Sequence, residues 1–195
     1  MVRAPPSPTP EPALGSRPQR RVAHRLDERQ WHDGLGKRLR VVGRLERARP
    51  LLEKLGTTIT YIGDHGAGQV AKACNQIVQV VNIEGIAEAM LFARANGVDC
   101  STVLRALQAG FAGSKMLDLM GPKMAGRDFA AGIEARLHQK DYGLILEMAH
   151  EAGLAMPAVA IVAQQLNALV GQGWGKQDTS ALLKVLEAAN GRSSD

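Results

Sequence analysis

The sequence predicts an all-α domain from about residue 66 onward, preceded by a segment of different composition. Three observations support this prediction. A long stretch from Gly66 to Asn96 has apolar residues at helical spacing, and several shorter stretches of the same kind follow it. Glycine or proline separates one stretch from the next. Only one β-branched run, at residues 57–62, has the character of a strand.

Residues 1–43 are expected to be disordered. Residues 1–50 hold seven of the nine prolines and carry 12 Lys+Arg against 5 Asp+Glu, whereas residues 51–195 carry 12 against 14. Prolines block helices, and few large apolar side chains are available to offset the chain entropy. The arginines make nucleic-acid binding or a targeting peptide an alternative. Neither is favoured, because a recognition helix and a stacking platform are missing and acidic residues interrupt the cluster.

Residues 44–64 predict two short elements before the helical domain. Apolar residues from Leu45 to Leu55 have the spacing of a short helix that ends at Gly56, with Pro50 near its middle. The run Thr57–Ile62 then predicts one strand, closed by Gly63. No second strand candidate follows, so the ladder partners of this strand are expected to be missing from the chain.

The segment from Gly66 to Asn96 predicts the longest helix, on the order of 40 Å. Apolar residues cover most of its circumference between Ile77 and Ala93, which indicates a central position. Further helices are predicted in this order: Ser101 (as the cap) through Leu107; residues 115–120, stopped at Gly121-Pro122; residues 137–152; a helix beginning at Pro157; and residues 180–189, capped by Asp178 or Thr179.

Composition excludes several classes of protein. Aromatic residues make up 4% of the chain, so the core is expected to be aliphatic. The two cysteines, Cys74 and Cys100, fit neither a disulfide scaffold nor a four-ligand zinc site, and we expect both to be small buried apolar residues in a reducing cytoplasm. No run reaches the ~18 apolar residues of a membrane span, and no secretory signal is present. We expect a cytoplasmic protein without membrane contact.

The first candidate site lies at the start of the long helix. Gly66 and Gly68 allow a backbone or a ligand to approach closely, and Lys72 and Asn75 are three residues apart on one helix face near the positive end of the helix dipole. A partly desolvated lysine there could exchange a proton, and an asparagine could hold a hydroxyl or carboxylate oxygen. The alternative is a solvated polar first turn, which spacing alone favours.

The second candidate cluster is Leu137-His138-Gln139-Lys140-Asp141. His138 and Asp141 are three residues apart, which suits a metal or an acid–base pair, but no further ligand at helical spacing supports a metal. We therefore predict no metal site. The simpler interpretation is a helix N-terminus with Asp141 as a partner of the helix dipole, and Lys140 could instead meet a phosphate or a ring of a cofactor.

Three motifs together resemble the β-hydroxyacid dehydrogenases, the 3-hydroxyisobutyrate dehydrogenase-like family related to 6-phosphogluconate dehydrogenase. Residues 66–76 are similar to the family's G-x-G-x-x-x-K-x-x-N motif, and residues 137–141 are similar to its K-D motif on the cofactor side. Residues 110–114 and 178–182 most resemble the tartronate semialdehyde reductase branch. The order and spacing of the motifs agree over about three quarters of the chain.

The resemblance implies a fold and a function. Residues 65–190 would form the all-α, multi-helix substrate and dimerisation domain of a 6-phosphogluconate dehydrogenase-like fold, and residues 44–64 would be a remnant of the Rossmann domain with its last strand. The chain would belong to an NAD- or NADP-dependent oxidoreductase that acts on a small hydroxy acid, such as 2-hydroxy-3-oxopropanoate and D-glycerate. Lys72 would be catalytic, Asn75 would bind the substrate, and Lys140 and Gly68 would contact the cofactor.

The sequence also departs from the pattern of this family. The G-x-G-x-x-G fingerprint and the Ser-Gly-Gly-type loop are missing upstream, and Gly132-Ile133 stands where relatives often have Gly-Phe. We therefore expect a truncated or frame-shifted form of a longer reductase. Its expected partners are a small hydroxy-acid or aldehyde-acid substrate and further copies of the chain, with no nucleic acid and no membrane. The alternative is a non-catalytic helical oligomerisation module.

Overall fold

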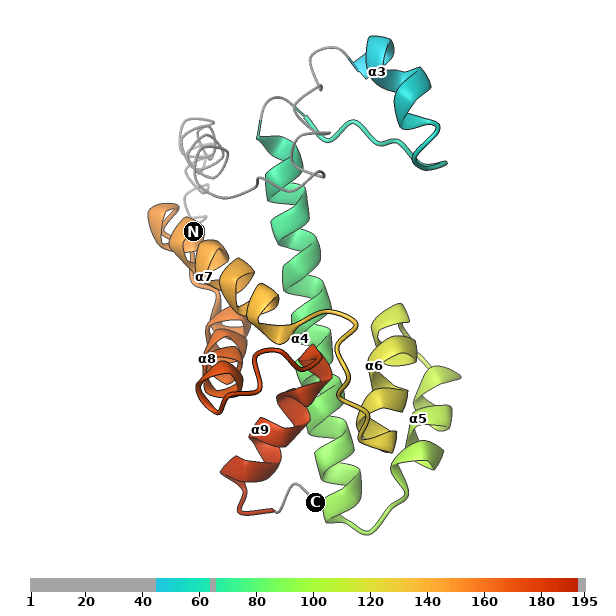
Figure 1. The fold of residues 1–195 in the computed structure, drawn as a ribbon, viewed down its shortest axis with the longest axis vertical. Helices are drawn as coiled ribbons and strands as arrows, with labels where there is room; N and C mark the ends of the chain where they lie inside the picture. Colours follow the sequence, from blue (N-terminus) through green and yellow to red (C-terminus); the bar gives the residue numbers. More distant parts are fainter. Residues whose placement is uncertain (1–44, 64–65, 193–195) are drawn as a thin grey trace, which may run out of the picture.

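The computed structural model describes residues 45–63 and 66–192, and the regular structure in them is helical. The long helix α4 (Ala67–Ala95) forms the axis of a bundle (Figure 1). Around it lie α5 (Cys100–Gln108) and α6 (Lys115–Gly126) on one side, and α7 (Ala135–Glu151), α8 (Pro157–Gly171) and α9 (Leu182–Ala189) on the other. A 3₁₀ turn, η2 (Thr179–Ala181), leads directly into α9. The all-α prediction is confirmed.

The core is built around one face of α4, which contacts every other helix of the bundle. Val80, Ile83, Ala87 and Met90 recur at helical spacing on that face and are completely buried. Tyr142 is the only buried aromatic side chain in the part of the chain that the structure describes. The core is therefore aliphatic, as the composition predicts, and α4 is its centre. Cys100 is buried in it as expected, but Cys74 is exposed on α4, which corrects the prediction that both cysteines are buried.

Helix α4 is both long and apolar. By length and composition it is the one described helix that could cross a membrane. Core helices of soluble proteins pass the same test, and α4 packs against α5 to α9 in the manner of such a core helix.

The segment before α4 differs from the prediction in one respect. The helix α3 (Leu45–Leu52) forms with Pro50 inside it, and Figure 1 shows it set apart from the bundle, beyond the N-terminal end of α4. Residues 57–62, however, form no strand. A strand requires a neighbour to complete its backbone hydrogen bonds, and no ladder partner lies among the described residues. The leftover strand is thus a correction, and the predicted disorder of residues 1–43 falls outside the described range.

Two boundaries in α5 and α6 also correct the prediction. The N-cap of α5 is Asp99, not Ser101, because the Asp99 side chain accepts a hydrogen bond from the Thr102 amide at 2.7 Å. Helix α6 continues through Gly121-Pro122 and ends only at Gly126, with Arg127 as its C-cap at a left-handed φ of 57°. Gly121 is buried, and a Cβ there would lie 2.4 Å from Leu104 Cδ1. Close packing of α5 on α6 therefore outweighs the local stop signal.

The observed starts of the last three helices agree more closely with the predicted ones. Helix α7 begins at Ala135, two residues before the predicted start, and α8 begins at Pro157 as predicted. Asp178 caps η2, since its side chain accepts a hydrogen bond from the Ser180 amide. The connections before α7 and before η2 lie side by side and carry an isolated antiparallel bridge between Glu134 and Asp178.

Candidate active site

The first turns of α4 hold the residues of the first candidate cluster. Gly66 precedes the helix with a φ of 88°, a left-handed conformation that glycine adopts readily, and the first turn carries no acidic side chain. Gly68 is buried in that turn rather than presented to solvent. Because the first turn itself carries no carboxylate, the positive potential of the helix terminus favours an anionic group nearby.

Lys72 and Asn75 lie on this part of α4. Lys72 is half-buried and Asn75 is exposed. Residues three apart on a helix are neighbours on its surface, so the ammonium and the side-chain amide are available to one ligand. The next residue, Gln76, connects this surface to α7.

A carboxylate on α7 forms that connection. Gln76 Nε2 donates a hydrogen bond to Asp141 Oδ2 at 2.8 Å, and the ammonium of Lys140 lies 3.5 Å from Asp141 Oδ1. Asp141 itself is buried, whereas Lys140 is exposed. Because Gln76 follows Asn75 and lies one turn beyond Lys72, the contact brings the α4 cluster and Lys140 to the same crossing of two helices.

Tyr142 fixes the crossing from inside. Its ring is completely buried, and its hydroxyl donates to the backbone carbonyls of Ile77, at 3.2 Å, and Gln76, at 3.4 Å. Burial raises the pKa of Tyr142 well above its usual range, so the hydroxyl stays a donor at all ordinary pH values. Helix α7 is therefore anchored to the backbone of α4 next to Lys72 and Asn75.

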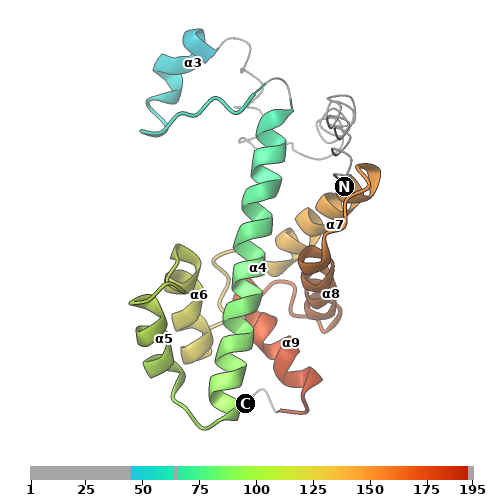
Figure 2. The ribbon, with the colours of Figure 1, turned by 180° about the vertical axis from the view of Figure 1, so that it is seen from behind.

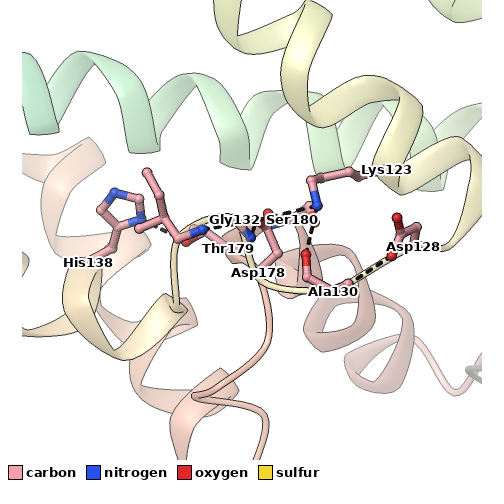
Figure 3. Close-up of polar contacts among 9 residues, drawn as sticks. Lys123, Asp128, Ala130, Gly132, His138, Asp178, Thr179 and Ser180 are labelled. Carbon is pink, nitrogen blue, oxygen red and sulfur yellow. Dashed lines mark hydrogen bonds and ion pairs between the residues drawn. The ribbon is translucent and has the colours of Figure 1, made fainter.

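His138 does not belong to this cluster. The structure buries it and joins its Nδ1 to Thr179 Oγ1 at 2.7 Å (Figure 3). Burial lowers the pKa of His138 by more than the carboxylates of Asp141 and Asp178 raise it, so the imidazole is neutral at physiological pH. Among the described residues no group of three His, Cys, Asp or Glu side chains gathers as a metal site would need.

Sequence reasoning missed Gln76 as a member of the site and treated Asp141 as a dipole partner. The spacing of Lys72 and Gln76, one helical turn apart, is a signal that could have included Gln76. The partnership of Gln76 with Asp141 has no local signal, because it depends on the crossing of α4 and α7.

Known proteins match this domain. Residues 66–186 match the family model described as the NAD-binding domain of NADP-dependent 3-hydroxyisobutyrate dehydrogenase. The 2-hydroxy-3-oxopropionate reductase of Escherichia coli is 42% identical over 142 residues, which are 73% of this chain and 49% of that protein. The NAD-dependent L-serine dehydrogenase of Pseudomonas aeruginosa is 33% identical over 155 residues, covering 76% of this chain and 52% of that one.

Solved structures agree with the sequence matches. The 3-hydroxyisobutyrate dehydrogenase of Mycobacterium tuberculosis, described with L-serine, superposes with a TM-score of 0.66 at 29% identity over 73% of this chain and 51% of that chain. The chain spans about half the length of the curated relatives it matches. Because the family model matches more than half of this chain, the chain belongs to the 3-hydroxyisobutyrate dehydrogenase family of NAD(P)-dependent oxidoreductases.

Proposed function

We propose that the chain is the substrate-side half of an NAD- or NADP-dependent reductase that converts 2-hydroxy-3-oxopropanoate to D-glycerate. One observation carries the proposal. The hydrogen bond between Gln76 and Asp141 joins the helix that bears Lys72 and Asn75 to the helix that bears Lys140. The 42% identity to the E. coli 2-hydroxy-3-oxopropionate reductase supports the substrate class.

The residues of the crossing suit such a substrate and cofactor. Lys72, Asn75 and Lys140 offer N–H donors, and Asp141, the carboxylate between them, is turned toward Gln76 and Lys140. A set of donors of this kind fits the carboxylate and carbonyl oxygens of an aldehyde acid and the polar groups of a nicotinamide. Lys140 would contact the cofactor, and Gly68 would let the backbone come close to it. Bound NAD(P)H supplies the hydride.

Lys72 has the central role in the proposed reaction. Its ammonium donates a proton to the aldehyde oxygen while the carbonyl carbon gains the hydride, and the product is a primary alcohol. In the reverse direction the neutral amine takes the proton back. Its positive charge also stabilises the alkoxide as it develops. Asn75 orients the substrate by hydrogen bonding, and its exposed position at the α4 surface leaves it accessible.

The test uses a fusion of this chain to the nucleotide-binding half of the E. coli reductase. Lys72→Ala should lower kcat roughly 10²–10⁴-fold, the usual contribution of a general acid. The matched control is Lys115→Ala, an exposed lysine at the start of α6, which should leave kcat unchanged. Activity of Lys72→Ala within about tenfold of the parent would show that Lys72 is not the acid. The chain by itself should bind NADH and NADPH weakly or not at all.

A second candidate function is homo-oligomerisation through α4. Figure 2 shows the side of the molecule on which α4 lies in front of the other helices. On α4, Val78 and Phe92 are 69% and 72% exposed, and Gly85 lies midway between them, seven residues from each. Two antiparallel copies centred on Gly85 would place each Val78 against a Phe92, which is a self-complementary arrangement.

Sedimentation velocity tests the second candidate. The chain should sediment as a dimer, and Phe92→Glu should convert it to a monomer, whereas Lys115→Glu should not. A monomeric parent would contradict the dimer. A dimer together with an inactive fusion would favour the oligomerisation module over the reductase.

A further inference from the structure

The loop before α7 and the loop before α9 are joined by backbone hydrogen bonds. The Asp178 amide donates to the Phe129 carbonyl at 3.0 Å, the Ala135 amide to Gln177 at 2.9 Å, and the Arg136 amide to Gly175 at 3.0 Å. These bonds link the N-terminal end of α7 to a segment about 40 residues later in the sequence. The start of α7 is therefore set by the C-terminal part of the chain.

The carboxylate of Asp178 strengthens this link. Its Oδ1 caps η2 by accepting from the Ser180 amide at 3.0 Å, while its Oδ2 accepts from the amides of Gly132, at 2.9 Å, and Ile133, at 3.4 Å. Lys123 Nζ lies 3.6 Å from the same Oδ2 and donates to the Ala130 carbonyl at 2.7 Å. Figure 3 shows Asp178 beside Gly132, with Lys123 approaching from α6. One buried carboxylate thus holds a helix cap and a loop together.

Thr179 extends the link into α7 itself. Its hydroxyl is completely buried and hydrogen-bonds His138 Nδ1 at 2.7 Å. His138 lies in the second turn of α7, two residues before Lys140 and three before Asp141. The cap of η2 uses only Oδ1 of Asp178. Oδ2 of Asp178 and the hydroxyl of Thr179 instead bind the loop before α7 and His138 of α7. The hydrogen bonds of these two groups restrain the rotation and the position of the N-terminal end of α7.

We propose that Asp178 and Thr179 are positioning residues that hold Lys140 and Asp141 in place against α4. They act through the loop at Gly132 and through His138. The effect of these residues on turnover rests on the proposed reductase function. Their effect on the Gln76–Asp141 bond does not, and it can be measured in the chain alone. A failure of the positioning role can therefore be distinguished from a failure of the reductase function.

The first experiment follows the Gln76 side-chain amide of the full 195-residue chain by NMR, as a reporter of its bond to Asp141. Thr179→Val should raise the exchange rate of these amide protons at least tenfold, and Thr179→Ser, which keeps the hydroxyl, should restore it. Asp178→Asn keeps the Oδ1 cap but turns an N–H group toward the amide of Gly132. It should raise the exchange rate as Thr179→Val does, and it replaces Thr179→Val as the test if that variant does not fold. Unchanged Gln76 exchange in a folded Thr179→Val or Asp178→Asn variant overturns the proposal.

The matched control is Glu187→Gln, which weakens the attachment of α9 to Arg94 and Arg127 away from α7. It should lower thermal stability without changing Gln76 exchange. If it accelerates Gln76 exchange as much as Thr179→Val does, the effect is general loosening and the proposal is wrong.

The second experiment measures kinetics in the fusion enzyme. Thr179→Val should lower kcat/KM for the cofactor roughly tenfold, because small displacements of positioned groups are costly. Thr179→Ser should restore it and Glu187→Gln should not change it. A parent fusion without activity would overturn the reductase function, while the NMR result would still decide the positioning role.

Discussion

The side-chain amide of Gln76 donates to the carboxylate of Asp141 at 2.8 Å, across 65 residues of sequence. This bond joins the two helices that carry the predicted site residues, next to the hydrogen bonds from the Tyr142 hydroxyl to the backbone of α4. It explains why a buried aspartate follows the exposed Lys140 on α7.

Loss of this bond should affect turnover more than folding. In the fusion enzyme, Gln76→Ala leaves the buried Asp141 carboxylate with Lys140 alone, so α7 should shift at the crossing. We expect kcat to fall about 10- to 100-fold and the free energy of unfolding to fall by about 1–2 kcal/mol. Steady-state kinetics and urea unfolding measure the two effects. A variant with full activity would show that the bond does not position the site.

The carboxyl of Glu84 should make stability depend on pH. Glu84 is buried in α4, and neither of its oxygens has a hydrogen-bond partner among the described residues. Burial, and to a smaller extent the charge of Glu88, raise its pKa from 4.5 to about 7. The folded state therefore prefers the protonated form. Its contribution to stability is complete below pH 4.5 and is lost as the pH rises toward 7 and beyond, by at most about 3 kcal/mol.

Glu84→Gln checks this expectation, because glutamine keeps the shape without the titration. The variant should match the parent near pH 5 and exceed its stability at pH 8, as measured by urea unfolding across that range. Glu88→Gln, on the exposed side one turn further, is the control and should change the pH slope much less. Equal pH slopes for parent and Glu84→Gln would show that Glu84 does not titrate in this window.

The attachment of α9 should depend on one buried carboxylate. Glu187 Oε1 accepts from Arg94 of α4, at 2.5 Å, and from Arg127 after α6, at 2.8 Å, while its side chain is 1% exposed. Glu187→Ala leaves two guanidinium groups together without their partner. Because both arginines reach solvent in part, we expect a loss of about 2–3 kcal/mol rather than the full cost of an isolated buried charge. Thermal unfolding measures it; Glu151→Ala, on the exposed end of α7, should cost much less.

Gly121 should be costly to replace, because a larger residue has no space there. An added Cβ would lie 2.4 Å from Leu104 Cδ1, so Gly121→Ala must displace α5 or the leucine, at a cost of roughly 1–3 kcal/mol. Gly126→Ala in the same helix is the control. It has nothing within 4 Å of the added Cβ and should be neutral or slightly stabilising. A Gly121→Ala variant combined with Leu104→Ala should lose less than the sum of the two changes.

The sequence predicts the elements better than their contacts. Helices α4 and α8 agree with the prediction because long apolar periodicity and the proline at position 157 are local signals. The extension of α6 past Pro122 could not be predicted, since it depends on the packing of Leu104 against Gly121. Residues 57–62 show the opposite case. They have β propensity, but they form no strand, because no neighbouring strand lies among the described residues.

The same division holds for the site. The shared face of Lys72 and Asn75 follows from helical spacing, and the K-D motif locates Lys140. The bond between Gln76 and Asp141 and the one between Asp178 and Gly132 span 65 and 46 residues. Their formation depends on how helices cross, and no local pattern in the chain encodes that.

The contact between Asp178 and Gly132 has a consequence for the order in which the protein can mature during synthesis. Lys72, Asn75 and Lys140 are all translated before Asp178 and Thr179, which secure the start of α7. A nascent chain that ends at Gly171 holds every predicted site residue but lacks the segment that fixes their arrangement. Contacts of such long sequence separation form late, because the loop must close before they stabilise anything. Ribosome-stalled chains of increasing length should therefore acquire the protected Gln76 amide only after α9 has emerged.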